Sequence, residues 1–254
     1  MRIHKLQTLL TSNRSLCAFA VCVVAFSTLA ASATVVPPPA SSGLDIYIGQ
    51  TVNAKLDSIL VDPKVGGIDV TYNGTVYGPA YDDRIWAGCY VIDVENIVED
   101  YAGFCMDVTL DPAQSSFVSH TAMSVSSDFE YMWGTYYDDI FDGAGNDSVE
   151  AAAFQLAVWE IVHEGSGTYD VSTGDFYLSA LNTGSANNNG ATMASLIAQA
   201  NIYLDSGSWT TRATLAALTA DGYQPLLVAI PEPATMSLLA LSGMAMLRGR
   251  RKRS

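Results

Sequence analysis

Two residues of this 254-residue chain have side chains and surroundings suited to acyl chemistry. Cys105 lies in the segment 103–108 (Gly-Phe-Cys-Met-Asp-Val), where large apolar neighbours predict a buried strand. Gln155 lies 50 positions later, in the apolar segment 151–162. A thiol is a nucleophile and a carboxamide carries an acyl carbon. If the fold holds the two groups together, they can exchange ammonia for a thioester.

The segment 151–162 (Ala-Ala-Ala-Phe-Gln-Leu-Ala-Val-Trp-Glu-Ile-Val) predicts a helix that presents Gln155 within an apolar face. At about 100° per residue, that face also carries Ala151, Ala152, Trp159 and Val162. A buried carboxamide without hydrogen bonds costs about 1 to 3 kcal/mol, so Gln155 needs a partner. Taken alone, the pattern favours a core glutamine whose amide is satisfied by hydrogen bonds.

The elements that must position these residues change in character along the chain. Period-two and β-branched patterns predict strands first, helical spacing follows, and strands return at the end. This order predicts an α+β fold, with a β-rich core that is barrel-like or sandwich-like and an inserted helical subdomain that carries the glutamine motif. An Asn73-Gly74 hairpin turn is expected, and Asp147 with Glu150 predicts a capping box. The predicted strands are 44–52, 65–76, 85–94, 104–110, 175–179, 214–218 and 226–230, and the predicted helices are 129–137, 148–164 and 191–204.

The first 33 residues have the order of a secretory signal: a basic start, an apolar run, and small residues at 31–33. Cleavage before Thr34 is expected, and it removes Cys17 and Cys22. A Pro-rich linker, 34–43, and a domain, 44–230, follow. A retained membrane anchor is the alternative, although the apolar run is short for a spanning helix.

Charge excludes one class of partner. Of the 12 Lys and Arg residues, only four lie between residues 34 and 230, whereas 25 of the 26 Asp and Glu residues lie there. A domain this acidic would repel a phosphate backbone, so we expect no nucleic acid partner.

The segment 231–254 has three parts: Pro-Glu-Pro, an apolar stretch at 234–247, and an Arg-rich tail. It resembles the PEP-CTERM sorting signal. The resemblance implies transient membrane insertion, cleavage by an exosortase, and release to the surface or extracellular matrix of a Gram-negative bacterium. A plain C-terminal anchor is the alternative, and it would not require the Pro-Glu-Pro. The residues that carry the signal are Pro231, Glu232, Pro233, Arg248, Arg250 and Arg251.

The Cys105 and Gln155 segments together resemble the thioester domains of bacterial surface proteins, in the version found on PEP-CTERM proteins. The resemblance implies an internal thioester between Cys105 and Gln155, shielded from water by Trp159 and Phe104. Such a bond would attach the protein once to an amine or hydroxyl on an unknown partner, for adhesion or cross-linking in a surface layer or biofilm. It would not turn over as an enzyme, and it needs no cofactor. Phe154 replaces the threonine that precedes the glutamine in the best-known motif.

Cys89 supplies the main rival interpretation. In an oxidising compartment, two cysteines ordinarily suggest a disulfide, here Cys89 to Cys105, which would exclude the thioester. Free thiols in a non-reactive structural protein of a matrix or biofilm are the other alternative. No metal site is expected, because Cys89, Cys105, His120 and His163 lack paired short spacings. His163 is interpreted as a surface residue, not as a base.

Overall fold

The computed structural model describes residues 46–59, 65–78, 85–97, 101–143, 145–164, 168–182 and 188–230, which belong to one compact unit spanning Val35–Ser254. The predicted signal peptide 1–33, the linker 34–43 and the sorting segment 231–254 lie outside these residues. No helix within the described residues is long and apolar enough to cross a membrane.

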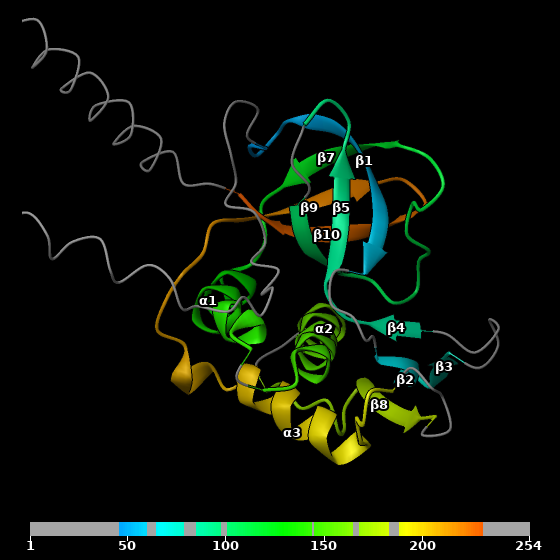
Figure 1. The fold of residues 1–254 in the computed structure, drawn as a ribbon, viewed down its shortest axis with the longest axis vertical. Coiled ribbons are helices and arrows are strands. Elements are labelled where there is room, and N and C mark those ends of the chain that lie inside the picture. The colour runs from blue at the N-terminus through cyan, green and yellow to red at the C-terminus, as the bar shows by residue number, and fades with distance from the viewer. Residues whose placement is uncertain are drawn as a thin grey trace, which may run out of the picture. The chain divides into compact units, whose positions relative to one another are not determined.

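Six strands form a closed barrel in the order β1-β5-β6-β10-β9-β7, and each pair of neighbours is antiparallel (Figure 1). Alternate side chains fill its interior, as in β5, where Tyr90, Ile92 and Val94 are buried. Gly103 allows β6 to lie close to β10, because a Cβ at this position would lie 2.5 Å from the carbonyl oxygen of Leu227. The strands are β1 Thr51–Ile59, β5 Tyr90–Val94, β6 Tyr101–Cys105, β7 Val118–Met123, β9 Leu215–Ala220 and β10 Tyr223–Ala229.

A smaller antiparallel sheet is built around β2 Val65–Tyr72. One edge of β2 pairs with β3 Thr75–Tyr77 and β4 Ile85–Ala87, and its other edge pairs with β8 Phe176–Leu181. The predicted hairpin turn is confirmed, since Asn73 and Gly74 both have positive φ, at 48° and 75°.

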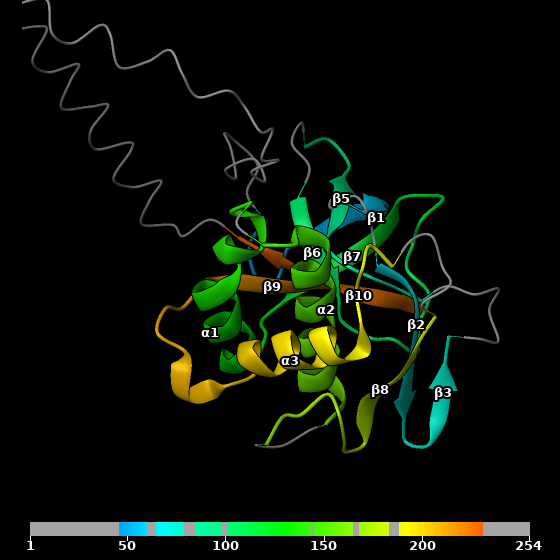
Figure 2. The same ribbon diagram turned by 60° about the horizontal axis from the view of Figure 1, so that its bottom comes forward.

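The helices are α1 Ser127–Tyr136, α2 Asp147–His163 and α3 Met193–Tyr203, with short 3-10 helices at Asp138–Phe141 and Ser206–Ser208. Figures 1 and 2 show α2 between the barrel and α3, with α1 at its side. It contacts β6 of the barrel and also β2, β4 and β8 of the smaller sheet. A helix enclosed in this way must be apolar on every side, and α2 is buried at every position from Ala151 to Ile161. The apolar face predicted for this helix therefore extends around its whole circumference.

The predicted α+β class with a β-rich core is confirmed, and the core is a barrel. The three helices do lie in one insertion, between β7 and β9. That insertion also contains β8, which joins the smaller sheet by pairing with β2. Through the pairing of β8 with β2, the helical subdomain is hydrogen-bonded to the N-terminal half of the chain.

The predicted strands differ from the structure at several points. The predicted strand 85–94 is divided between β4 of the smaller sheet and β5 of the barrel, and β7 was not predicted. Residues 46–50 of the predicted strand 44–52 form a turn in which Gly49 has φ 88°, and β1 begins only at Thr51. The predicted strand 104–110 ends at Cys105, because the Asp107 carboxylate accepts a hydrogen bond from the backbone N–H of Thr109 at 2.8 Å and starts a turn.

The predicted helix cap is also shifted by one residue. Asn146, and not Asp147, is the N-cap of α2, and its side-chain oxygen accepts from the N–H of Val149 at 3.3 Å. Asp147 is instead the first residue of the helix, where its negative charge is favourable.

One acidic side chain is enclosed within α2. Glu160 has no solvent-exposed area, its Oε1 accepts from the N–H of Asp170 at 2.7 Å, and its Oε2 has no partner among the described residues. Burial raises the pKa of this carboxyl to about 7, and the charges of Glu164 and Asp170 add to the effect.

This raised pKa predicts a pH dependence for the variant Glu160→Gln. The raised folded pKa means that the neutral carboxyl is fully stabilising below the usual value of 4.5, and that this stability is lost as pH rises to about 7. Relative to wild type, the variant should gain about 3 kcal/mol in free energy of unfolding between pH 4 and pH 8. Urea denaturation at the two pH values measures the change, and parallel pH dependences would show that folding does not raise the pKa of Glu160.

Candidate functional site

Cys105 is the last residue of β6, and it lies beyond the point where the neighbouring strand β5 stops pairing with β6. Pairing with β5 ends at Tyr90, which lies opposite Gly103. On the other side, Cys105 lies opposite Leu226 of β10, and the next bond across that pair runs from the N–H of Met106 to the carbonyl of Pro225. Backbone groups alternate in direction along an antiparallel strand. The N–H and C=O of Cys105 therefore point to the side that β5 has left.

The carboxamide of Gln155 fills this position. The N–H of Cys105 donates to Gln155 Oε1 at 3.0 Å, and Gln155 Nε2 donates to the carbonyl oxygen of Cys105 at 2.5 Å. The side chain thus pairs with one residue of β6 as a neighbouring strand would. Both bonds are buried, and they supply the partners that a glutamine in an apolar helix requires.

The two bonds also orient the reacting groups predicted from the sequence. A planar amide that bonds through both ends to the backbone of Cys105 holds its own carbon, Cδ, opposite the Cα of that residue. The Cys105 side chain, which carries the thiol, branches from this Cα. The structure therefore brings the carboxamide of Gln155 into direct contact with the backbone of Cys105, 50 positions away.

Cys89 occupies a different environment. Both cysteines are free and buried. Cys89 packs in the cluster that surrounds the helices, and Cys105 packs in the cluster inside the barrel. Polar groups of Gly103, Tyr90 and Tyr137 lie near the thiol of Cys89 and act to lower its pKa, but burial outweighs them. The two thiols therefore pack among different neighbours, and neither is joined in a disulfide.

Burial determines the protonation of both thiols. It raises the pKa of Cys89 to about 12, and it raises the pKa of Cys105 further, with the nearby Cys89 adding to the shift. At neutral pH both groups are therefore thiols. Any reaction at Cys105 must rely on its held geometry, since burial keeps the thiolate scarce.

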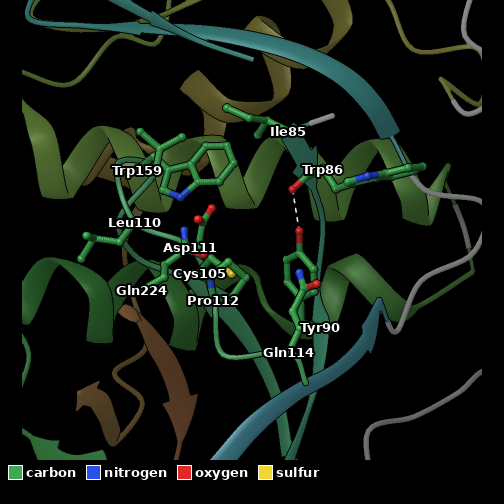
Figure 3. A pocket seen from close by; sticks show the side chains of 11 residues that line it. Ile85, Trp86, Tyr90, Cys105, Leu110, Asp111, Pro112, Gln114, Trp159 and Gln224 are labelled. Atoms are coloured by element: carbon green, nitrogen blue, oxygen red, sulfur yellow. Dashed lines mark hydrogen bonds between the residues drawn. The ribbon is translucent and has the colours of Figure 1, made fainter. Parts of the chain in front are cut away.

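A pocket of about 180 Å³ adjoins Cys105. Figure 3 shows Trp159 on one side of it and Tyr90 on the other, and the hydroxyl of Tyr90 donates to the carbonyl of Trp86 at 2.6 Å. Trp159 is 2% exposed, and its Nε1–H has no hydrogen-bond acceptor among the described residues. The lining consists of Ile85, Trp86, Tyr90, Cys105, Val108, Leu110, Asp111, Pro112, Gln114, Trp159 and Gln224.

The two aromatic residues expected to shield the site lie in different places. Trp159 is one helical turn after Gln155 and lines the pocket with Cys105. Phe104 is fully buried in the cluster around the helices, where its ring centroid lies 4.8 Å from that of Phe154 and 5.5 Å from that of Trp133. Shielding by either residue stays a prediction.

Three further predictions concern the sorting signal, His163 and metal binding. The sorting-signal residues Pro231 to Pro233 and Arg248 to Arg251 lie outside the described residues. His163 was interpreted as a surface residue, but its side chain is only 5% exposed and stacks on Phe176. Within the described part of the chain, no group of three or more His, Cys, Asp or Glu residues is placed to hold a metal ion.

Sequence reasoning missed the polar lining of the pocket. Asp111 and Gln114 lie in the loop between β6 and β7, and Gln224 lies in β10. The backbone N–H of Gln224 donates to the carbonyl of Asp111 at 3.0 Å, which fixes that loop against the barrel. Since these residues come from separate segments, no spacing in the sequence could have associated them.

Comparison with known proteins gives one remote similarity. No family model matches the chain, and no curated protein matches it. Among solved structures, it is similar to the N-terminal domain of the Streptococcus pyogenes pilus tip adhesin Cpa. The two are 12% identical, the match covers 68% of this chain and 97% of that one, and the TM-score is 0.37. A similarity of this size leaves function to the chemistry of the site.

Proposed function

We propose that this chain is an exported surface or matrix protein that forms an internal thioester between Cys105 and Gln155 and uses it once to attach covalently to a partner. The observation that carries the proposal is the pair of buried hydrogen bonds between the Gln155 carboxamide and the backbone of Cys105. An ordinary core glutamine needs hydrogen-bonding partners, but these need not both be backbone groups of a single cysteine.

The geometry supports a defined route to the thioester. The Cys105 sulfur bonds to Gln155 Cδ, the bond from Cδ to Nε2 breaks, and the thiol proton leaves with the nitrogen as ammonia. Negative charge that develops on Oε1 faces the N–H of Cys105, which already lies 3.0 Å away. The leaving nitrogen starts from a hydrogen bond to the carbonyl of Cys105.

Capture of a partner reverses the exchange at the same carbon. An amine or a hydroxyl attacks Gln155 Cδ, an amide or ester forms, and the bond to sulfur breaks to return the Cys105 thiol. The acyl group is consumed, so each molecule reacts once and is not an enzyme. Export through the segment 1–33 and cleavage near Pro231 by an exosortase-type protease would deliver this domain to a Gram-negative cell surface or its extracellular matrix.

A second candidate function is a non-reactive structural role in a matrix or biofilm. One observation favours it: the Gln155 amide is satisfied at both ends while the Cys105 thiol remains free. In this case the cysteine and glutamine would only stabilise the end of β6.

Treatment with methylamine separates the two functions. The reactive protein should gain the mass of one methylamine and release one thiol, so that titration of the denatured chain rises from one thiol to two. The two thiols are Cys89 and Cys105, the cysteines that remain after signal removal. A chain that shows two thiols before treatment and gains no mass has the structural role.

A further inference from the structure

The pocket beside Cys105 contains an unmet hydrogen-bonding need. The indole Nε1–H of Trp159 can only donate, and no described residue accepts from it. Leaving such a group buried and unpaired is costly, so a ligand that enters the pocket gains by supplying an acceptor. Figure 3 shows the nitrogen-bearing edge of the indole turned toward the side of the pocket that holds Asp111.

Asp111 lines the same pocket and is exposed to solvent. Its carboxylate can only accept, and it makes no hydrogen bond or ion pair with the residues that the structure describes. At neutral pH an alkylamine is mostly an ammonium ion, which pairs with Asp111 but has neither an acceptor for the indole of Trp159 nor a lone pair with which to attack an acyl carbon. A hydroxyl group both donates and accepts, so one hydroxyl, or two neighbouring ones, satisfies both residues.

The remaining lining favours a group with several hydroxyls. Gln114 and Gln224 add side-chain amides, and the Gln224 amide is fixed by donation from Nε2 to the carbonyl of Asp107 at 2.5 Å. Trp86 and Tyr90 add aromatic surface. A serine or threonine side chain brings a single hydroxyl. A sugar ring offers several hydroxyls together with an apolar face.

The size of the pocket agrees with a small group. A volume of about 180 Å³ lies below the roughly 300 to 1,000 Å³ of sites that enclose drug-sized ligands. One ring or one short polyol can enter beside Cys105, whereas a folded partner must present such a group at the end of a chain.

We infer that the group captured by this domain is a hydroxyl of a carbohydrate or similar polyol, with Asp111 as proton acceptor and Trp159 as hydrogen-bond donor. The inference rests on the proposed function and names its substrate class. The hydroxyl oxygen bonds to Gln155 Cδ, the bond from Cδ to the Cys105 sulfur breaks, and an ester remains. The hydroxyl proton passes to the Asp111 carboxylate and ends on the departing sulfur, which becomes the thiol.

Reaction with glycerol and with n-propylamine tests the chemical selectivity. Mass spectrometry should detect a glycerol adduct that hydroxylamine cleaves, as expected for an ester. In Asp111→Asn, the rate with glycerol should fall at least tenfold, and the rate with propylamine should fall much less. In Asp221→Asn, the matched control at an exposed turn, both rates should equal those of wild type. Equal losses for both probes in Asp111→Asn, or an adduct with propylamine alone, would overturn the inference.

A binding measurement makes the test independent of the thioester. Among the four tryptophans, the Nε1–H resonance of Trp159 can be assigned by its absence from Trp159→Phe. Glycerol should shift this resonance saturably, and propylammonium should not. If the wild-type mass shows no loss of ammonia, the proposed function fails, but the resonance still decides whether the pocket recognises hydroxyls. A shift with propylammonium alone, or equal reactivity of N-acetylserine amide and glycerol, contradicts a carbohydrate partner.

Discussion

Replacement of Cys105 or Gln155 by alanine is expected to abolish the ammonia loss and every covalent adduct, whereas replacement of Cys89 leaves both intact. The first two variants remove the nucleophile and the acyl carbon that the backbone of Cys105 holds together. Cys89 packs on the helix side of the barrel wall and forms no part of that arrangement. Intact mass before and after methylamine treatment provides the measurement.

The cross-link should also contribute to stability. If it restricts the unfolded chain as a disulfide of similar loop length does, its loss in Cys105→Ala lowers the free energy of unfolding by about 2 to 4 kcal/mol. Loss of the mass deficit in Cys89→Ala, with Cys105 present, would assign the modification to a disulfide instead.

Phe104→Ala is expected to be strongly destabilising. The Phe104 ring has no exposed area and packs between Phe154 and Trp133, so that its removal leaves a cavity between β6 and the helices. Large-to-small changes of this kind cost about 3 to 5 kcal/mol. Urea denaturation should show this loss as a lower midpoint with little change in slope.

Phe117→Ala is the matched control for this variant. Phe117 is 40% exposed, and its ring contacts the ammonium of Lys55 at 5.0 Å. A contact of this type contributes about 0.5 to 1 kcal/mol, so the control should lose no more than that. Similar losses in the two variants would mean that Phe104 does not join the barrel to the helices.

Helices and the hairpin were predictable because their signals are local. The spacing of apolar residues predicted all three helices to within about two residues at each end, and Asn73-Gly74 predicted its turn. The end of β6 was not predictable from apolar pattern alone. There, the Asp107 carboxylate accepts hydrogen bonds from the N–H and the hydroxyl of Thr109, and the resulting turn overrides the tendency of the following apolar residues to continue the strand.

The candidate site was predictable in part for the same reason. The residue types of Cys105 and Gln155 and their apolar surroundings indicated acyl chemistry. The resemblance to bacterial thioester domains indicated that the two residues react with each other. Nothing in the sequence indicated that β5 begins only at Tyr90, so that its pairing with β6 stops at Gly103 and leaves the backbone of Cys105 open to a side-chain amide. The pocket lining depends on the packing of a loop against β10, which is a long-range contact with no local signature.

The mass difference between wild type and Cys105→Ala tests the central claim most directly, because the processed ends of the chain cancel. An unmodified wild-type protein exceeds the variant by one sulfur atom. A thioester between Cys105 and Gln155 reduces this difference by one molecule of ammonia, and that is the result we predict. A difference of one full sulfur atom, or one reduced by two hydrogens as a disulfide requires, would contradict the thioester.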